Sequence, residues 1–359
     1  MIPRILSVTA DTEEPFVVRL CNAANDDSEK DAILIGKGEN SALYSCHLGL
    51  FEIAGLESEE LDGDVVLVKP SVGRAERLIR AKSDHNSLLV TERCDQLCVM
   101  CSQPPKKTHA DRFSALTEAS LLAPRDCVIG ITGGEPTLYK DQLLRMLERV
   151  ISVRPDLSFQ VLSNGQHFDQ ADVLRLRNPI YRRVQWGIPL YASTANLHDE
   201  IVGKVGAFNR LQESFAYLIS AGSRVELRTV LLTSNVHELP AIARFVVSRL
   251  RFVEAWSIMQ LENIGFARNR WPELYVDHSR HFDSIGHALS LSLLHGLNAR
   301  LFNFARCTVP PEFREYALAS ISDWKRRYAE ACGVCSERAR CSGFFEWHPD
   351  PDAVGVTPL

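Results

Sequence analysis

Three cysteines within eight residues constrain this chain more than any other feature. Cys94, Cys98 and Cys101 are spaced C-x3-C-x2-C. Structural zinc is almost always held by four ligands, so three thiols on one loop fit that metal poorly. They fit a [4Fe–4S] cluster, and because the usual fourth cysteine is missing, one iron is free to bind another ligand. The alternative is three unrelated core cysteines, since free cysteine is commonly buried.

A glycine-rich motif follows the three cysteines, directly after a short apolar run. It reads Gly133-Gly134-Glu135-Pro136. Glycines allow close backbone approach to a ligand, and a carboxylate accepts charge-assisted hydrogen bonds from an amine. The motif alone could be a simple turn. Beside the three cysteines, and with a predicted strand leading into it, we interpret it as part of a ligand site.

Composition narrows the class of protein. The chain has 359 residues, 45% of them hydrophobic and 24% charged, as in an ordinary globular protein. Its formal net charge of −5 gives no electrostatic case for nucleic acid as the main partner. No apolar run is long enough for a membrane span, and the first residues lack the apolar core of a secretory signal. Seven of the ten cysteines fall in two clusters, which favours metal over disulfides and predicts a cytoplasmic location.

The pattern of apolar runs predicts three parts. Residues 1–85 contain short β-branched runs between glycines and predict a small β-rich domain. Residues 86–304 alternate strands with helices, which is typical of βα units around a parallel sheet. Residues 305–359 lose that rhythm and contain four cysteines. The six strands predicted in the middle part are 87–90, 128–132, 159–162, 184–188, 225–232 and 255–261.

Two stretches of the middle part have a helical apolar period. The first stripe is Leu143, Leu147, Val150 and Ile151, and the second is Phe208, Leu211, Phe215, Leu218 and Ile219. We expect each stripe to lie against the sheet as core. The motifs fall at the carboxyl ends of predicted strands, where parallel α/β folds bind ligands. His198, His237 and His287 are expected to be solvated or capping residues.

Taken together, the cysteine loop and the Gly-Gly-Glu-Pro motif resemble the radical S-adenosylmethionine (SAM) superfamily. The resemblance implies an α/β fold, a partial (β/α)6 barrel, in which the cluster on Cys94, Cys98 and Cys101 chelates SAM through its open iron. Reductive cleavage of SAM would then give a 5′-deoxyadenosyl radical that abstracts hydrogen from a substrate. It also implies a reductant such as flavodoxin or ferredoxin as a partner.

The same resemblance assigns further residues to the SAM site. It implies cofactor contacts for Met100, Gly133, Gly134, Glu135, Pro136, Ser163, Asn164 and Glu262. The Glu135 carboxylate would bind the SAM amino group. A turn at Ser163-Asn164-Gly165 and an ordinary strand exit at Leu261–Ala267 are the structural alternatives. The chain departs from the family at Ile188–Tyr191, where Pro189 donates no hydrogen bond, and at Met100, where an aromatic residue is common. No residue is identified as the catalytic acid or base.

A second set of four cysteines lies near the end of the sequence: Cys307, Cys332, Cys335 and Cys341. It resembles the SPASM and twitch extensions, which hold auxiliary iron–sulfur clusters. Four thiols suffice for one fully ligated [4Fe–4S] cluster. Structural zinc on the same four thiolates is the alternative. The predicted fold therefore adds a C-terminal cysteine-rich auxiliary-cluster extension to the barrel and the N-terminal β-rich domain.

A narrower resemblance extends over nearly the whole chain. Cys101–Pro105, Cys307–Phe313, Ser320–Lys325 and Cys341–Phe345 resemble the His-Xaa-Ser system radical SAM maturases. This implies a ribosomally made precursor peptide as substrate and companion maturation proteins as partners. We expect the peptide to pair with an exposed strand edge of the domain at 1–85. The alternatives are a radical SAM enzyme for a small metabolite, and a non-catalytic iron–sulfur or zinc scaffold.

Overall fold

The computed structural model describes residues 4–23, 29–351 and 355–359. Residues 1–3, at the start of the predicted domain 1–85, lie outside the described residues. The chain divides into two compact units. Unit 1 comprises residues 1–91, 110–132 and 139–160, and unit 2 comprises residues 92–109, 133–138 and 161–359. No helix among the described residues is long and apolar enough to cross a membrane.

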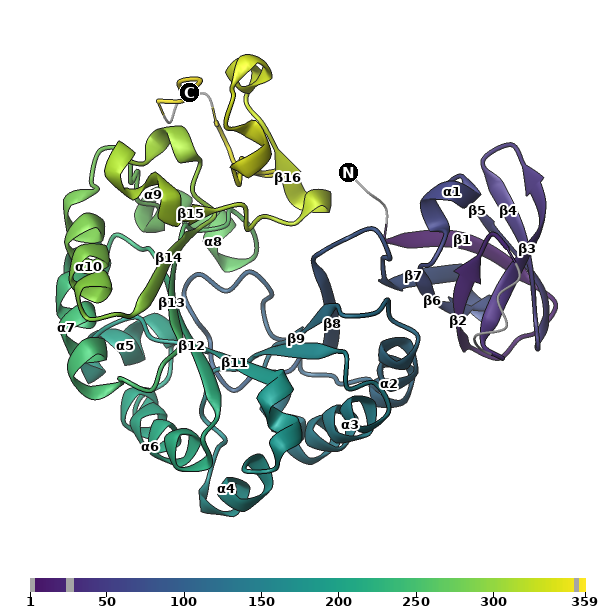
Figure 1. Cartoon of the computed structure of the whole chain (residues 1–359), viewed down its shortest axis with the longest axis horizontal. Helices are drawn as coiled ribbons and strands as arrows, with labels where there is room; N and C mark the ends of the chain where they lie inside the picture. Colours follow the sequence, from purple (N-terminus) through teal and green to yellow (C-terminus); the bar gives the residue numbers. More distant parts are fainter. Residues whose placement is uncertain (1–3, 24–28, 352–354) are drawn as a thin grey trace. The chain divides into compact units, whose positions relative to one another are not determined.

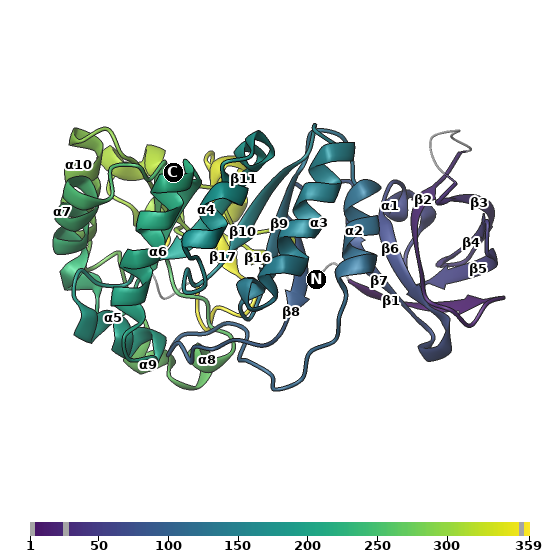
Figure 2. The same cartoon turned by 90° about the horizontal axis from the view of Figure 1, so that it is seen from below.

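The first part of unit 1 is a closed β-barrel (Figure 1 and Figure 2), with strand order β1-β5-β4-β3-β2-β6-β7. Alternating burial along these strands, as in β1, places one apolar face inside. Phe51 lies at the centre, with its ring edge-on to Phe16 and stacked on Tyr44. The elements are β1 (Ile5–Ala10), β2 (Phe16–Cys21), β3 (Asp31–Gly38), β4 (Ser41–Cys46), β5 (Gly49–Ala54), α1 (Ser58–Leu61), β6 (Val65–Lys69) and β7 (Arg74–Ile79).

Closure of this barrel corrects one expectation. Strand β1 pairs antiparallel with β5 and also with β7, so neither β1 nor β7 is an edge strand. The shortest seams among the described strands of the barrel are β1–β7 and β2–β3, with three registered residue pairs each, and β2–β3 is the parallel one. Each of the seven described strands is paired on both sides, so the expectation of an exposed strand edge in this domain is wrong. Seven short strands with one apolar face bury that face best by closing.

The rest of the strands, apart from a small pair near the end of the chain, belong to an eight-stranded sheet. Its order is β15-β14-β13-β12-β11-β10-β9-β8. The four neighbouring pairs from β11 to β15 are parallel. Besides the barrel, unit 1 contains β8 (Asn86–Thr91), α2 (Phe113–Leu121), β9 (Val128–Gly133) except its last residue, α3 (Lys140–Val153) and the start of β10 (Ser158–Leu162).

Unit 2 carries the remaining elements, and Figure 1 shows its helices α5, α6, α7 and α10 on the outer side of strands β11–β14. They are α4 (Gln170–Leu176), β11 (Val184–Pro189), α5 (Ala195–Val202), α6 (Ala207–Ala221), β12 (Arg224–Val230), α7 (Leu239–Arg249), β13 (Ala255–Met259), α8 (Phe266–Asn269), α9 (Trp271–Leu274), α10 (Asp283–Leu294), β14 (Asn298–Phe302), β15 (Ala317–Leu318), β16 (Arg326–Arg327) and β17 (Phe344–Phe345). Strands β16 and β17 form a separate antiparallel pair.

The six predicted strands are confirmed as β8 to β13, but the sheet continues further. Strands β14 and β15 were not predicted. The first has five residues with Arg300 in its middle, and the second has only two, so neither shows a strand pattern in the sequence. They form because each pairs in parallel with the strand before it. An α/β fold with a parallel eight-stranded sheet replaces the expected six strands.

The predicted helical stripes are confirmed with one exception. Leu143, Leu147, Val150 and Ile151 are buried along α3. In α6 the stripe is buried up to Leu218, but Ile219 is 51% exposed. Ile219 is one position past Leu218, and a turn of about 100° per residue carries it to the solvent side of the helix.

Candidate active site

The three cysteines Cys94, Cys98 and Cys101 lie on a loop of unit 2 without regular structure. All three are partly buried and free of disulfides. Burial raises the pKa of each thiol, to about 11 for Cys94 and to about 12 for Cys98. The Cys98 thiol donates to Gln96 Oε1 at 3.7 Å. Thiols in such surroundings become thiolates when a metal binds and displaces their protons.

The backbone of this loop is held from three directions. Glu135 N donates to Arg93 O at 2.7 Å. Leu97 N and Val99 N donate to the carbonyls of Val202 and Ile201, at 3.1 and 2.9 Å. Those carbonyls end helix α5, where helical partners are missing. The third contact runs from Phe266 N to Cys101 O at 2.9 Å. Each contact lies within three residues of a cysteine, so the loop is positioned by main-chain bonds.

Glycines make this close approach possible. A Cβ on Gly134 would lie 2.2 Å from Arg93 O, and one on Gly265 would lie 2.2 Å from Cys101 O. Gly203, with φ of 64°, meets Leu97 O in the same way at 2.6 Å. The sequence suggested that Gly134 allows close approach of a ligand. In the structure, the backbone of the cysteine loop packs closely against Gly134.

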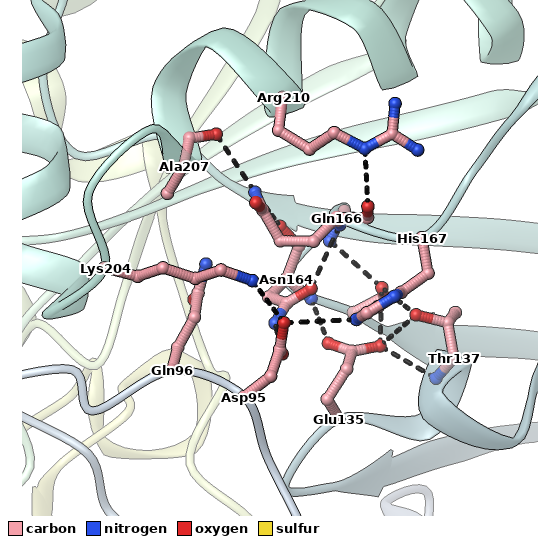
Figure 3. A network of polar contacts seen from close by, with 12 residues as sticks. Asp95, Gln96, Glu135, Thr137, Asn164, Gln166, His167, Lys204, Ala207 and Arg210 are labelled. Atoms are coloured by element: carbon pink, nitrogen blue, oxygen red, sulfur yellow. Dashed lines mark hydrogen bonds and ion pairs between the residues drawn. The ribbon is translucent and has the colours of Figure 1, made fainter.

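Glu135 is completely buried, and its carboxylate is occupied by donors of the chain (Figure 3). Oε1 accepts from Thr137 N at 2.8 Å, Thr137 Oγ1 at 2.5 Å and Ser163 Oγ at 2.9 Å. Oε2 accepts from Asn164 N. Burial raises the pKa of Glu135, and these four bonds oppose that rise. Glu135 and Ser163 therefore join the exits of β9 and β10, and their predicted contacts with SAM stay predictions.

Asn164 connects this network to the cysteine loop. Its main-chain N–H donates to Glu135, while its side-chain Nδ2 donates to Asp95 Oδ1 at 2.8 Å. The Asp95 carboxylate also meets His167 Nε2 at 3.3 Å and the Lys204 ammonium. Burial alone would raise the pKa of Asp95, but its bonds to His167, Lys204 and Asn164 lower it well below the usual range. Asp95 could not be singled out from the sequence, since one aspartate beside a cysteine is not a motif.

The other predicted SAM contacts lie in different surroundings. Met100 is buried against Ile201, Leu232 and Leu261 in an apolar cluster of unit 2. Gly133 ends β9, and Pro136 begins a short 3-10 helix. Glu262 follows β13, and its carboxylate lies 3.4 Å from Lys325 Nζ. Burial raises the pKa of Glu262, although Lys325 opposes the rise. These residues share a unit with the cysteine loop, and their roles toward SAM stay predictions.

The segment Tyr191–Phe208 runs from just after the end of β11 through α5 to the first turn of α6. His198 is buried, not solvated: its Nδ1 accepts from Tyr191 N at 3.3 Å and its ring lies 5.8 Å from that of Tyr191. Burial lowers the pKa of His198 to about 4. Asp199 accepts from Gly206 N and Phe208 N, at 2.6 and 2.8 Å, and so caps α6. This segment supports the cysteine loop through the end of α5. His237 and His287 are exposed, as expected.

The four C-terminal cysteines are brought together. Cys307, Cys332, Cys335 and Cys341 line one pocket of unit 2, with Thr357, Pro358 and Leu359 on its wall. Main-chain N–H groups point at the sulfurs: those of Arg306 and Gly343 lie 3.3 Å from Cys341 Sγ, and that of Leu359 lies 3.5 Å from Cys335 Sγ. Amide donors of this kind stabilise thiolates. Within the described residues, no three His, Cys, Asp or Glu side chains are gathered closely enough to hold a single metal ion.

Residues 88–246, which include the cysteine loop and the Gly-Gly-Glu-Pro motif, match the protein family described as the Radical SAM superfamily. The match supports a radical SAM domain in this part of the chain, and that family uses a [4Fe–4S] cluster and SAM. Three thiols on one loop, without a fourth, suit that cluster. The match covers less than half of the chain.

Several solved structures are similar to the chain at low identity. One is SuiB of Streptococcus suis, with 16% identity, a TM-score of 0.48, and coverage of 60% of this chain and 48% of that one. Another is anSMEcpe with bound AdoMet, with 11% identity, a TM-score of 0.48, and 60% and 63% coverage. A third is a radical SAM methyltransferase from Sphaerobacter thermophilus, with 14% identity, a TM-score of 0.44, and 77% and 78% coverage.

The chain thus spans about half of SuiB and 63% of anSMEcpe. No curated protein matches it.

Proposed function

We propose that the protein is a radical SAM enzyme that modifies a ribosomally synthesised peptide. The single observation that carries the radical SAM part is the cysteine loop. Three thiols lie on one segment that main-chain bonds hold beside Glu135 and Asn164, within a domain of that family. When bound, the cluster and SAM supply reductive cleavage of SAM and hydrogen abstraction from the substrate.

The residues of this chain have the tasks of binding and orientation. Cys94, Cys98 and Cys101 would hold the cluster. Gly134 and Gly265 keep the loop tight against its neighbours, and Glu135 fixes the exits of β9 and β10 around it. The apolar cluster around Met100 keeps water from one side of the cysteines. A non-catalytic scaffold would have no use for an open iron, whereas three cysteines in place of the usual four leave one iron free for SAM.

The proposal includes an auxiliary [4Fe–4S] cluster on Cys307, Cys332, Cys335 and Cys341. It is supported by the shared pocket and by the N–H groups directed at Cys335 and Cys341. Zinc on the same thiolates remains the competing occupant. Anaerobically reconstituted protein should hold about eight irons and eight sulfides, as two cubanes. Replacing Cys94, Cys98 and Cys101 together should leave about four of each. Zinc retained at the C-terminal set would refute the auxiliary cluster.

The peptide substrate is supported by the narrower resemblance to the His-Xaa-Ser system maturases, and a small metabolite is the rival substrate. Both are tested by anaerobic incubation with SAM, a low-potential reductant and synthetic peptides with His-x-Ser repeats. We expect release of 5′-deoxyadenosine and a mass change in the peptide, with Cys98→Ala inactive in both assays. Release of 5′-deoxyadenosine that no such peptide stimulates, even with companion proteins added, would reject the peptide and keep the SAM chemistry.

A further inference from the structure

Asp95 is the charged residue that the cysteine loop carries between its first two cysteines, and Figure 3 shows three side chains converging on it. Asn164 Nδ2 lies 2.8 Å from Oδ1. His167 Nε2 lies 3.3 Å from Oδ2, and the Lys204 ammonium contacts the same oxygen. All four residues belong to unit 2. The carboxylate therefore joins the loop to three points of the surrounding fold.

These three points lie on two different segments. Asn164 and His167 follow β10, and Asn164 is itself fixed by Glu135. Lys204 lies in the connection between α5 and α6, directly after Gly203, which packs on Leu97 of the loop. Leu97 N and Val99 N already bind the cysteine loop to the end of α5 through the backbone. The Asp95–Lys204 ion pair adds a side-chain contact between the loop and the segment that follows α5.

Two charged residues, Arg93 and Asp95, flank Cys94 in the sequence, and Asp95 is paired with Lys204. The side chains of Asp95 and Lys204 are 24% and 35% exposed, so water screens them only in part. Reduction of a [4Fe–4S] cluster by one electron adds one negative charge. An uncompensated carboxylate nearby disfavours that step, and an uncompensated ammonium favours it, because net charge around a cluster sets its potential. Side by side, the two charges largely cancel.

We propose that Asp95 and Lys204 are positioning residues that act as a charge-compensated clamp: they hold the cysteine loop and keep the reduction potential of its cluster balanced. This inference rests on the proposed function, since it assumes that Cys94, Cys98 and Cys101 hold the cluster. If the pair only held the loop in place, removing either charge would shift the reduction potential of the cluster in no particular direction. The two charges, removed one at a time, must move it in opposite directions.

The test is a potentiometric titration at pH 8 of anaerobically reconstituted full-length protein, with dithionite as the one-electron reductant. The EPR signal that changes on adding SAM identifies the relevant cluster. Asp95→Asn keeps an oxygen for Asn164 but leaves Lys204 uncompensated, so the potential should become more positive. Lys204→Met leaves Asp95 uncompensated, so it should become more negative. The double variant should return close to the wild-type value.

A matched control is Arg224→Met, which removes a cation paired with Glu254 at 2.9 Å at the start of β12, and it should leave the potential unchanged. Shifts of equal sign in the two single variants, or none, with normal iron content would overturn the clamp while the proposed function stands. If Asp95→Asn fails to load iron, the two Lys204 variants test the clamp. A negative shift in Lys204→Met and in the milder Lys204→Gln supports it, and no negative shift overturns it. Wild-type protein that binds no iron through Cys94, Cys98 and Cys101 would overturn the proposed function and the clamp together.

Discussion

The main-chain N–H of Asn164 donates to the buried carboxylate of Glu135, so the residue after β10 is tied to the motif after β9. The side chain of Asn164 then reaches Asp95 in the cysteine loop. Asn164 thereby links two acidic residues, Glu135 and Asp95. The Glu135 carboxylate, which the sequence predicts to bind the SAM amino group, accepts four hydrogen bonds from the protein itself.

Glu135→Gln should destabilise the protein before any cofactor binds. The amide NH2 would face a donor, from either Asn164 or Thr137, so at least one hydrogen bond to a charged acceptor is lost in a buried site. We expect the free energy of unfolding of the metal-free protein to fall by about 1.5–3 kcal/mol, measured by urea titration. Ser163→Ala, which removes one donor, should cost about 1 kcal/mol. Unchanged stability in Glu135→Gln, with weaker SAM binding, would instead support a direct contact with SAM.

Gly134→Ala should lower the iron content of the three-cysteine site. Its Cβ would lie 2.2 Å from Arg93 O and 3.0 Å from Cys94 N, so the backbone that carries the first cysteine must move. The readout is iron per protein in a background with Cys332 and Cys335 replaced by alanine, together with the circular dichroism of the fold. Gly36→Ala is the control, because its Cβ meets only ordinary contacts at 3.5 Å or more. Full iron loading in Gly134→Ala would contradict the close approach.

Leu359→Pro should weaken the C-terminal four-thiol site. Proline has no N–H, so the donor 3.5 Å from Cys335 Sγ is lost. We expect iron at this site to be removed faster by a chelator than in the wild type, since an amide bond to a thiolate favours its charged form. Leu359→Ala keeps the N–H and should behave as wild type. Equal rates in the two variants would argue against a role for this donor.

Acid should destabilise the protein through His278. This ring is buried between Gln260 and Thr308, with polar contacts of 2.8 and 2.6 Å, and burial lowers its pKa to about 4. The unfolded chain binds the proton from about pH 6.5 downward and the folded protein only near pH 4, so stability is lost as pH falls between these values. The loss is up to ~3 kcal/mol at pH 4.

The measurement is the urea midpoint of unfolding from pH 7 to pH 4. His278→Gln keeps donor and acceptor groups for Gln260 and Thr308 without titrating, and its midpoint should fall less steeply over this range. His237→Gln, at an exposed position, is the matched control and should follow the wild-type slope. A His278→Gln slope equal to the wild-type slope would show that this ring does not titrate on unfolding.

Much of the fold could be read from the sequence because its signals are local. Apolar runs between turn residues indicated β8 to β13, and the helical period indicated the buried faces of α3 and α6. The spacing of Cys94, Cys98 and Cys101 also carries its chemistry locally, since three sulfurs on one short loop can reach one cluster. Strands β14 and β15 could not be predicted from the sequence, because a strand of five or two residues forms only through pairing with its neighbour.

What the tertiary structure decided is which groups face which. The sequence predicted SAM contacts for Gly134, Glu135 and Ser163, and these stay predictions. The fold adds that Gly134 packs against the cysteine loop and that Glu135 accepts from Ser163, Thr137 and Asn164. Asp95 and Lys204 are 109 positions apart and form no motif, but the fold puts their charges in contact. The identity of a buried polar group is encoded locally. Its hydrogen-bond partners come from distant segments, because a buried charge must be satisfied by whatever donors the packing brings to it.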